Sequence, residues 1–198
     1  MNFLAHLYLS GNDEQLMIGN FIADSVKGNH YNKFPKGIQK GILLHRAIDF
    51  YSDNHPVFLK SVERLRPKYR KYAGVIVDMF YDHFLAKNWK DYSEISLEQY
   101  AGEVHSLMLK NILHMPERSL LFLKHAMRTD LLIIYASTDG IGRALNGMSR
   151  RTTFKSNMEF AAEDLNEFYP EFEKEFRIFF EDARVFAKKW IEDRSVCP

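Results

Sequence analysis

The residues best suited to chemistry are carboxylates and imidazoles inside apolar stretches. In VIVDMFYDHFLAKNW, residues 75–89, Asp78 and Asp82 stand one helical turn apart among Val, Ile, Met, Phe and Tyr, and His83 follows. Carboxylates are almost never fully buried without a partner, and two of them in an apolar environment repel each other unless a cation lies between them. An arginine, a solvent edge or a metal ion could supply the compensation.

Three other segments carry such side chains on one helix face or inside an apolar run: His45, Asp49 and Asp53 in GILLHRAIDFYSDNHP, Asn20, Asp24 and Lys27 in IGNFIADSVKG, and His6 in NFLAHLYLS. Residues four apart lie on the same face of a helix, so the groups of one segment point the same way. Each segment has a structural alternative. A lone histidine on an apolar face is more often a hydrogen-bonded core residue, Asp49 could pair with Arg46, and Asp24 could pair with Lys27.

Four segments that each deliver imidazole or carboxylate together predict a metal site. Imidazole and carboxylate ligands without a thiolate suit Mn²⁺ or Mg²⁺, with Fe²⁺ as a further candidate, rather than a structural zinc ion. In helical proteins such ions activate water for attack on esters or handle oxygen in di-iron sites. Di-iron bundles use Glu-x-x-His pairs, which this sequence lacks. Hydrolysis is therefore the preferred chemistry.

The elements that must position these residues are helices. Apolar residues recur at three- and four-residue spacing along most of the chain, and strand-like alternation is rare. The spacing predicts an all-α, single-domain helical bundle over residues 1–198, with helices at about 13–27, 36–52, 56–70, 72–88, 96–113, 116–126, 130–136, 140–148, 153–168 and 170–192. Pro67 is expected to end or kink the third of these helices. The long amphipathic helices of 153–192 are assigned to the scaffold.

The net charge of +1 hides an uneven distribution. Residues 27–71 hold eleven Lys and Arg against three Asp and Glu, whereas residues 158–198 hold six against eleven. This segregation favours a basic face that steers an acidic partner, although two solvated helix faces of opposite sign would give the same counts. The single cysteine, Cys197, excludes an internal disulfide and is typical of a reducing cytoplasm. The short apolar N-terminus predicts neither a signal peptide nor a membrane span, and we expect no membrane or nucleic-acid partner.

Five motifs then follow one another in a recognisable order: NFLAHLYLS, IGNFIADSVKG, GILLHRAIDFYSDNHP, VDMFYDHFLAKNW and ALNGMSRR. From Asn2 to about Arg151 they resemble the motifs of the bacterial acyl carrier protein phosphodiesterases, also called acyl carrier protein hydrolyases. The resemblance implies hydrolysis of the phosphodiester that joins 4′-phosphopantetheine to a serine of holo-acyl carrier protein, with Mn²⁺ or Mg²⁺ as cofactor. It also implies an all-α fold distantly similar to the HD phosphohydrolases. This chain has no His-Asp dipeptide, so its ligands are assigned from shared helix faces.

On this basis the predicted ligands of one or two divalent cations are Asp24, His45, Asp49, Asp78 and Asp82, with His6 and His83 as further ligands or outer partners. Lys27 and Arg46 are predicted to contact the phosphate, and His83 to protonate the leaving alkoxide. Acyl carrier protein is small and acidic, so the resemblance gives the basic stretch a docking role, carried by Lys33, Lys36, Lys40, Arg64, Arg66, Lys68, Arg70 and Lys71.

Two alternatives stay open at this point. One is a metal-dependent phosphohydrolase of the same fold that acts on a nucleotide or another small phosphoester. The other is a non-enzymatic helical protein that binds acyl carrier protein through its basic face, with the buried acids forming a structural network.

Overall fold

The computed structural model describes residues 2–194, and this part of the chain is built from helices without any strand. The elements in chain order are α1 (Phe3–Leu9), α2 (Glu14–Ile22), η1 (Ala23–Ser25), η2 (Gly28–Lys33), α3 (Lys36–Asn54), α4 (Pro56–Tyr69), η3 (Arg70–Tyr72), α5 (Ala73–Lys87), η4 (Trp89–Asp91), α6 (Leu97–Lys110), η5 (Ile112–His114), α7 (Glu117–Arg128), α8 (Leu131–Ile134), α9 (Thr138–Ser149), η6 (Met158–Phe160), α10 (Ala161–Glu167) and α11 (Tyr169–Asp193), where η marks a 3₁₀ turn. The predicted all-α fold is confirmed. Cys197, on which the disulfide argument rests, lies outside the described residues.

Most predicted helices are present with ends shifted by a few residues, but one expectation was wrong and α1 was not predicted. Pro67 lies inside α4, which continues to Tyr69, so it does not itself end the helix, and the predicted kink stays a prediction. The segment 153–168 is α-helical only from Ala161. Asn157 adopts a left-handed conformation with φ 57°, which asparagine tolerates better than most residues and which a helix cannot contain.

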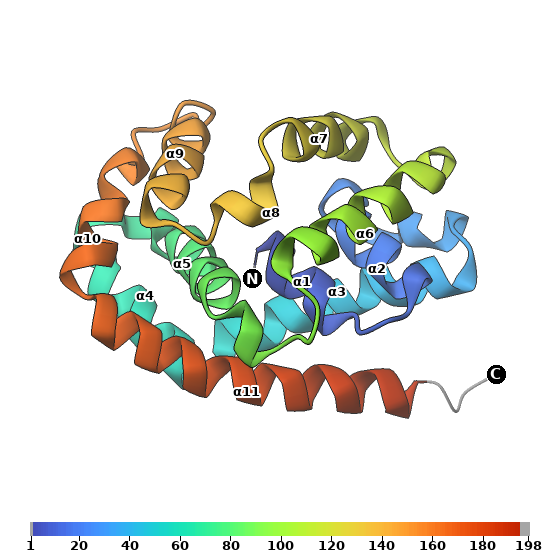
Figure 1. Cartoon of the computed structure of the whole chain (residues 1–198), viewed down its shortest axis with the longest axis horizontal. Helices are drawn as coiled ribbons and strands as arrows, with labels where there is room; N and C mark the ends of the chain where they lie inside the picture. Colours follow the sequence, from blue (N-terminus) through green and yellow to red (C-terminus); the bar gives the residue numbers. More distant parts are fainter. Residues whose placement is uncertain (1, 195–198) are drawn as a thin grey trace.

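Helix α5 lies at the centre of the bundle and packs against α1, α4, α9 and α11 (Figure 1). This placement explains why the helix is apolar on nearly every side, since a helix surrounded by other helices buries its whole circumference. Helix α11 runs along the lower edge of the view, whereas α9 and α7 lie at the upper edge. None of the described helices combines the length and the apolar character that crossing a bilayer requires.

Two glycines allow α2 and α3 to touch through their backbones. A Cβ atom at Gly19 would lie 2.2 Å from the carbonyl oxygen of Ile38, and one at Gly41 would lie 2.4 Å from that of Leu16. Any larger residue at either position would therefore push the helices apart. This close approach matters for function because α2 carries Asn20 and α3 carries His45.

The unequal charges of the sequence neutralise each other inside the fold. Arg64 of α4 donates to both carboxylate oxygens of Glu175 on α11, at 2.6 and 2.7 Å, and its side chain is only 17% exposed. Lys68 of α4 donates to Asp164 of α10 at 2.7 Å. The basic stretch thus meets the acidic C-terminal stretch within one molecule. The bidentate ion pair with Glu175 does not favour the docking role predicted for Arg64, which stays a prediction.

Candidate active site

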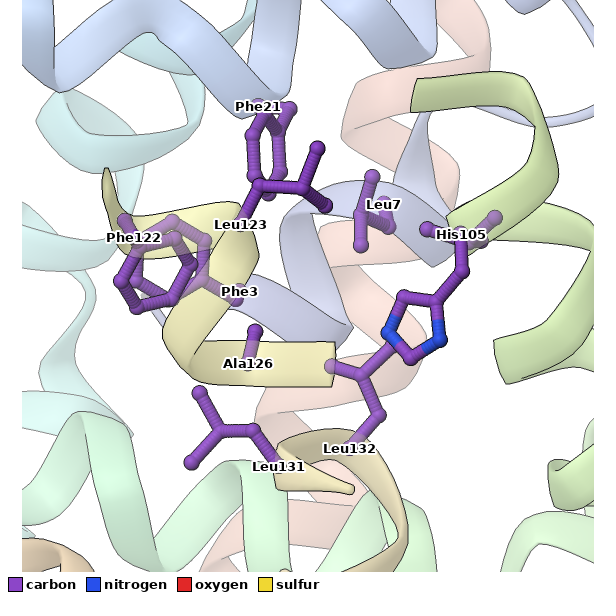
Figure 2. A pocket seen from close by; sticks show the side chains of 10 residues that line it. Phe3, Leu7, Phe21, His105, Phe122, Leu123, Ala126, Leu131 and Leu132 are labelled. Atoms are coloured by element: carbon purple, nitrogen blue, oxygen red, sulfur yellow. The ribbon is translucent and has the colours of Figure 1, made fainter. Parts of the chain in front are cut away.

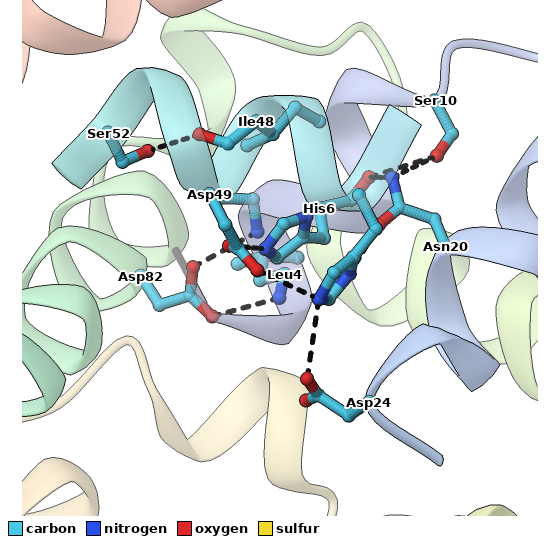
Figure 3. Close-up of polar contacts among 11 residues, drawn as sticks. Leu4, His6, Ser10, Asn20, Asp24, Ile48, Asp49, Ser52 and Asp82 are labelled. Atoms are coloured by element: carbon cyan, nitrogen blue, oxygen red, sulfur yellow. Dashed lines mark hydrogen bonds and ion pairs between the residues drawn. The ribbon is translucent and has the colours of Figure 1, made fainter. Parts of the chain in front are cut away.

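The structure brings four of the predicted site residues together from three segments (Figure 3). His6 comes from α1, Asp24 from η1, and His45 and Asp49 from α3. Nε2 of His45 lies 3.2 Å from Oδ2 of Asp49 and 3.4 Å from Oδ1 of Asp24. Nε2 of His6 lies 3.1 Å from Oδ1 of Asp49, so Asp49 bridges the two imidazoles. Both histidines are buried, whereas Asp24 is exposed at the rim.

Asn20 fixes the orientation of the His45 ring. Its amide nitrogen donates to the carbonyl oxygen of His6 and to Oγ of Ser10, both at 2.9 Å. Its amide oxygen therefore faces Nδ1 of His45 at 2.8 Å and can only accept. Nδ1 of His45 must carry a proton, and Nε2 is the nitrogen presented to Asp24 and Asp49. Asn20 was placed on the correct helix face by its spacing to Asp24, but the sequence alone assigned it no role.

The charges of this group are strongly coupled. Burial lowers the pKa of His45, but the Asp24 and Asp49 carboxylates outweigh burial and raise that pKa to about 9. Burial and the neighbouring His45 lower the pKa of His6 to about 3. Burial alone would raise the pKa of Asp49, yet its hydrogen bonds to both histidines hold it well below the usual range. The two imidazole rings stack with centroids 3.9 Å apart, and the protein keeps only one of them charged.

The donor set fits a divalent cation. One ligand atom each from His6, His45 and Asp49 lies within 4.8 Å of the others, and Asp24 adds a carboxylate at the rim. With His45 protonated the group carries two negative charges and one positive charge. A divalent ion that replaced the His45 proton would leave two neutral imidazoles and two carboxylates, which balance the ion. Mixed nitrogen and oxygen donors without sulfur suit Mn²⁺, Mg²⁺ or Fe²⁺.

Asp82 and Asp78 lie on α5, outside the group formed by His6, Asp24, His45 and Asp49. Asp82 is fully buried, and its two oxygens accept hydrogen bonds from the backbone nitrogens of Leu4 at 2.8 Å and Ala5 at 3.0 Å. It therefore caps the N-terminus of α1 from a neighbouring helix. Burial, with smaller contributions from the nearby carboxylates of Asp49 and Asp53, raises the pKa of Asp78 to about 6. Neither aspartate belongs to the group of donors gathered around His45, so their predicted ligand roles stay predictions.

His83 is occupied elsewhere, which does not favour the acid role predicted for it. Its Nδ1 donates to the carbonyl oxygen of Tyr135 at 2.8 Å, and its Nε2 accepts from the hydroxyl of Tyr169 at 3.0 Å. Burial lowers its pKa, so the ring is neutral. Asp82 and His83 are neighbours in sequence, but successive residues of a helix point about 100° apart and meet different elements.

The predicted phosphate contacts have different environments. Arg46 donates to the carbonyl oxygen of Val26 at 2.8 Å and lies over the Tyr31 ring at 5.4 Å, so it fastens the segment that follows Asp24. Lys27 is exposed and immediately precedes η2. Lys27 is therefore the cation better placed to meet a bound phosphate.

The remaining predicted docking arginines lie on α4 and its end. Arg66 is exposed and pairs with Glu63 at 2.7 Å, whereas Arg70 is exposed and ends α4 with a left-handed φ of 51°. Both lie at the C-terminal end of α4, where Lys68 donates to Asp164 of α10.

Comparison with known proteins gives one consistent result. The model of a family described as acyl carrier protein phosphodiesterase matches residues 1–183. A protein of that name from Enterobacter sp. (strain 638) is 33% identical over 189 residues, which cover 95% of this chain and 98% of the relative. A second from Photorhabdus laumondii subsp. laumondii is 31% identical over 181 residues, 91% of each chain. No solved structure matches, so the similarity to HD phosphohydrolases stays a prediction.

Proposed function

The chain belongs to the acyl carrier protein phosphodiesterase family, and we propose that it hydrolyses the phosphodiester that joins 4′-phosphopantetheine to the serine of holo-acyl carrier protein. Water attacks phosphorus, the bond from phosphorus to the serine oxygen breaks, and apo-acyl carrier protein and 4′-phosphopantetheine are released. The observation that carries the proposal is the convergence of His6, His45, Asp49 and Asp24 at one place. A cytoplasmic location belongs to the proposal, since a single cysteine is typical of a reducing compartment.

We further propose that His6, His45, Asp49 and Asp24 hold a divalent cation, Mn²⁺ or Mg²⁺ or alternatively Fe²⁺. Such an ion lowers the pKa of a water molecule and polarises phosphate oxygens. The protein supplies the remaining parts. Asn20 holds Nε2 of His45 toward the carboxylates, Asp49 ties α1 to α3 through its two histidine contacts, and Lys27 offers a positive charge to the phosphate.

Mass spectrometry of holo-acyl carrier protein tests the proposed reaction directly. Incubation with this protein and Mn²⁺ is expected to remove the mass of the 4′-phosphopantetheine group and to leave an unmodified serine. Chelation should stop the loss, and added Mn²⁺ should restore it. An unchanged holo-protein together with turnover of a nucleotide or a small phosphodiester would favour the small-phosphoester hydrolase instead. Binding of the carrier protein without turnover or cation uptake would favour the non-enzymatic binder.

The charge state of His45 makes cation binding dependent on pH. Because its pKa is raised to about 9, His45 holds a proton at pH 7 that must leave before Nε2 can bind a cation. The apparent affinity for Mn²⁺ should therefore rise about tenfold per pH unit and level off above pH 9. Titration calorimetry at pH 7, in two buffers of different ionisation enthalpy, should show about one proton released per ion. Binding without proton release would mean that His45 is not a ligand.

The same proton has the opposite effect on the cation-free protein. A histidine whose folded-state pKa is raised stabilises the fold below its unfolded value of 6.5, and this contribution is lost as the pH rises through about 9. The melting temperature without cation should thus fall between pH 7 and pH 9, whereas saturating Mn²⁺ should reduce the fall because the ion takes the place of the proton.

A further inference from the structure

Helix α7 is held rigidly against the helices that carry the site. The Phe122 ring stacks on Phe3 of α1 with centroids 4.0 Å apart and lies 5.8 Å from Phe21 of α2 (Figure 2). Leu123 and Ala126 bury the rest of this inner face. The cavity enclosed there is about 10 Å³, room for one water molecule at most, so it is not a ligand site.

The outer face of α7 is a basic stripe. Its exposed positions recur at helical spacing and are Glu117, Arg118, Leu121, Lys124 and Arg128, so three cations outweigh one carboxylate. Leu121 is 64% exposed in the middle of the stripe. Among residues 2–194, no salt bridge engages the three basic side chains, in contrast to the paired Arg64 and Lys68 of α4. Their charges are therefore available to a partner.

The turn before α7 adds an exposed apolar group. Leu113 of η5 is 94% exposed, and Leu109 and Ile112 beside it are about half exposed. Large apolar side chains gathered at the surface mark an interaction site more often than isolated ones do. We call the combined set the α7 surface: Leu109, Ile112, Leu113, Arg118, Leu121, Lys124 and Arg128.

The α7 surface begins beside the candidate active site. Oγ of Ser119, in the first turn of α7, donates to Oγ of Ser25 at 2.8 Å. Ser25 follows Asp24 in η1, and Asp24 forms the exposed rim of the site. Ser119 itself is buried on the inner side of α7, so this contact places the N-terminal end of α7 beside η1, and a protein bound over Arg118 at that end would lie close to Asp24 and Lys27.

We propose that the α7 surface is the docking surface for acyl carrier protein, an inference that rests on the proposed function. The substrate is an acidic helical protein that must present one modified serine to the site. Unpaired positive charges attract and orient such a partner, and exposed leucines bury apolar area once it has docked. The α7 surface offers both kinds of contact and begins beside η1, which holds Asp24, whereas Arg66 and Arg70 lie at the end of α4 that contacts α10.

Charge reversal on α7 tests this assignment. The double variant Arg118→Glu/Lys124→Glu should lower kcat/KM for holo-acyl carrier protein at least about tenfold, mostly through KM, and the loss should shrink with added salt. Lys188→Glu/Lys189→Glu on α11, at the opposite edge of the fold, changes the net charge equally and should stay within about twofold of the wild type. Leu113→Ser/Leu121→Ser should also weaken docking, but without the salt dependence. Mn²⁺ should stabilise all of these variants as it does the wild type, which shows that the cation site is intact.

Binding and turnover measurements test the docking surface and the proposed reaction independently of each other. Calorimetry gives the Kd of each variant for holo-acyl carrier protein, even if the wild type proves unable to hydrolyse it. Failure of the wild type to release 4′-phosphopantetheine would contradict the proposed function, and weaker binding by the α7 variant would still support the docking surface. An α7 variant that binds and turns over the carrier protein like the wild type would overturn the inference. A loss confined to an Arg66→Glu/Arg70→Glu variant would also overturn it and would place docking on α4.

Discussion

Replacing Asp49 with alanine is expected to lower kcat for release of 4′-phosphopantetheine by on the order of a thousandfold or more. Asp49 is the only described carboxylate that contacts both His6 and His45, at 3.1 and 3.2 Å. Its loss removes one proposed cation ligand and the link between α1 and α3. A bound metal ion contributes several kcal/mol of transition-state stabilisation, and about 4 kcal/mol corresponds to a thousandfold in rate. Steady-state turnover of holo-acyl carrier protein at saturating Mn²⁺ measures the effect.

Asp53 provides the matched control for this variant. It lies one turn further along the same helix and is exposed to solvent. Asp53→Ala should therefore keep near-wild-type turnover and the stabilisation by Mn²⁺, whereas Asp49→Ala should lose both. Retention of turnover by Asp49→Ala would show that the cation, if one is needed, binds elsewhere. Circular dichroism should show both variants as helical.

Much of the fold follows from the periodicity of the sequence. Apolar residues at three- and four-residue spacing located most of the helices, and the uniformly apolar segment around 75–89 proved to be the central helix α5. Periodicity does not reveal very short helices or single residues with an unusual backbone conformation. Seven residues are too short a window to establish a helical pattern, which explains why α1 was not predicted. The left-handed conformation of Asn157 likewise prevents a helix at this position, although the apolar spacing of the sequence predicts one there.

The candidate site could be predicted in part for a physical reason. Side chains at i and i+4 share a helix face, so His45 with Asp49, and Asn20 with Asp24, could be grouped from spacing alone. The direction in which each face turns depends on tertiary packing. For α2 and α3 that packing depends on Gly19 and Gly41, whose effect on helix approach has no signature in apolar spacing.

The same limit applies to charge. A cluster of Lys and Arg in the sequence shows that a segment is basic. It does not show whether these side chains face solvent or pair with acidic residues of another helix. Arg64 pairs with Glu175, 111 residues away, so its charge is used for a contact between α4 and α11 that the sequence did not predict. The basic stripe of α7 was not predicted, because Arg118, Lys124 and Arg128 are spread over eleven positions and separated by apolar and polar residues.

Replacing Asp82 with alanine is expected to lower both the stability of the protein and its affinity for Mn²⁺. The variant leaves the buried backbone nitrogens of Leu4 and Ala5 without their acceptor, which costs about 1–3 kcal/mol. For a chain of this length the melting temperature should fall by roughly 2–4 °C per kcal/mol. Helix α1 also carries His6, so a loosened α1 should weaken Mn²⁺ binding by about 10–100-fold, as the loss of supporting contacts does at other metal sites.

The dependence on Mn²⁺ concentration distinguishes a cap from a ligand. If Asp82 acts by positioning α1, excess Mn²⁺ should restore most of kcat to Asp82→Ala, and the cation-free variant should melt below the wild type. If Asp82 binds the ion itself, excess Mn²⁺ should restore little, and loss of a buried carboxylate should leave the cation-free protein equally stable or more stable. Asp78→Ala is the natural comparison, one turn earlier on α5. It leaves the cap of α1 in place, so it should lower the affinity for Mn²⁺ less than Asp82→Ala does if the cap is what supports the site.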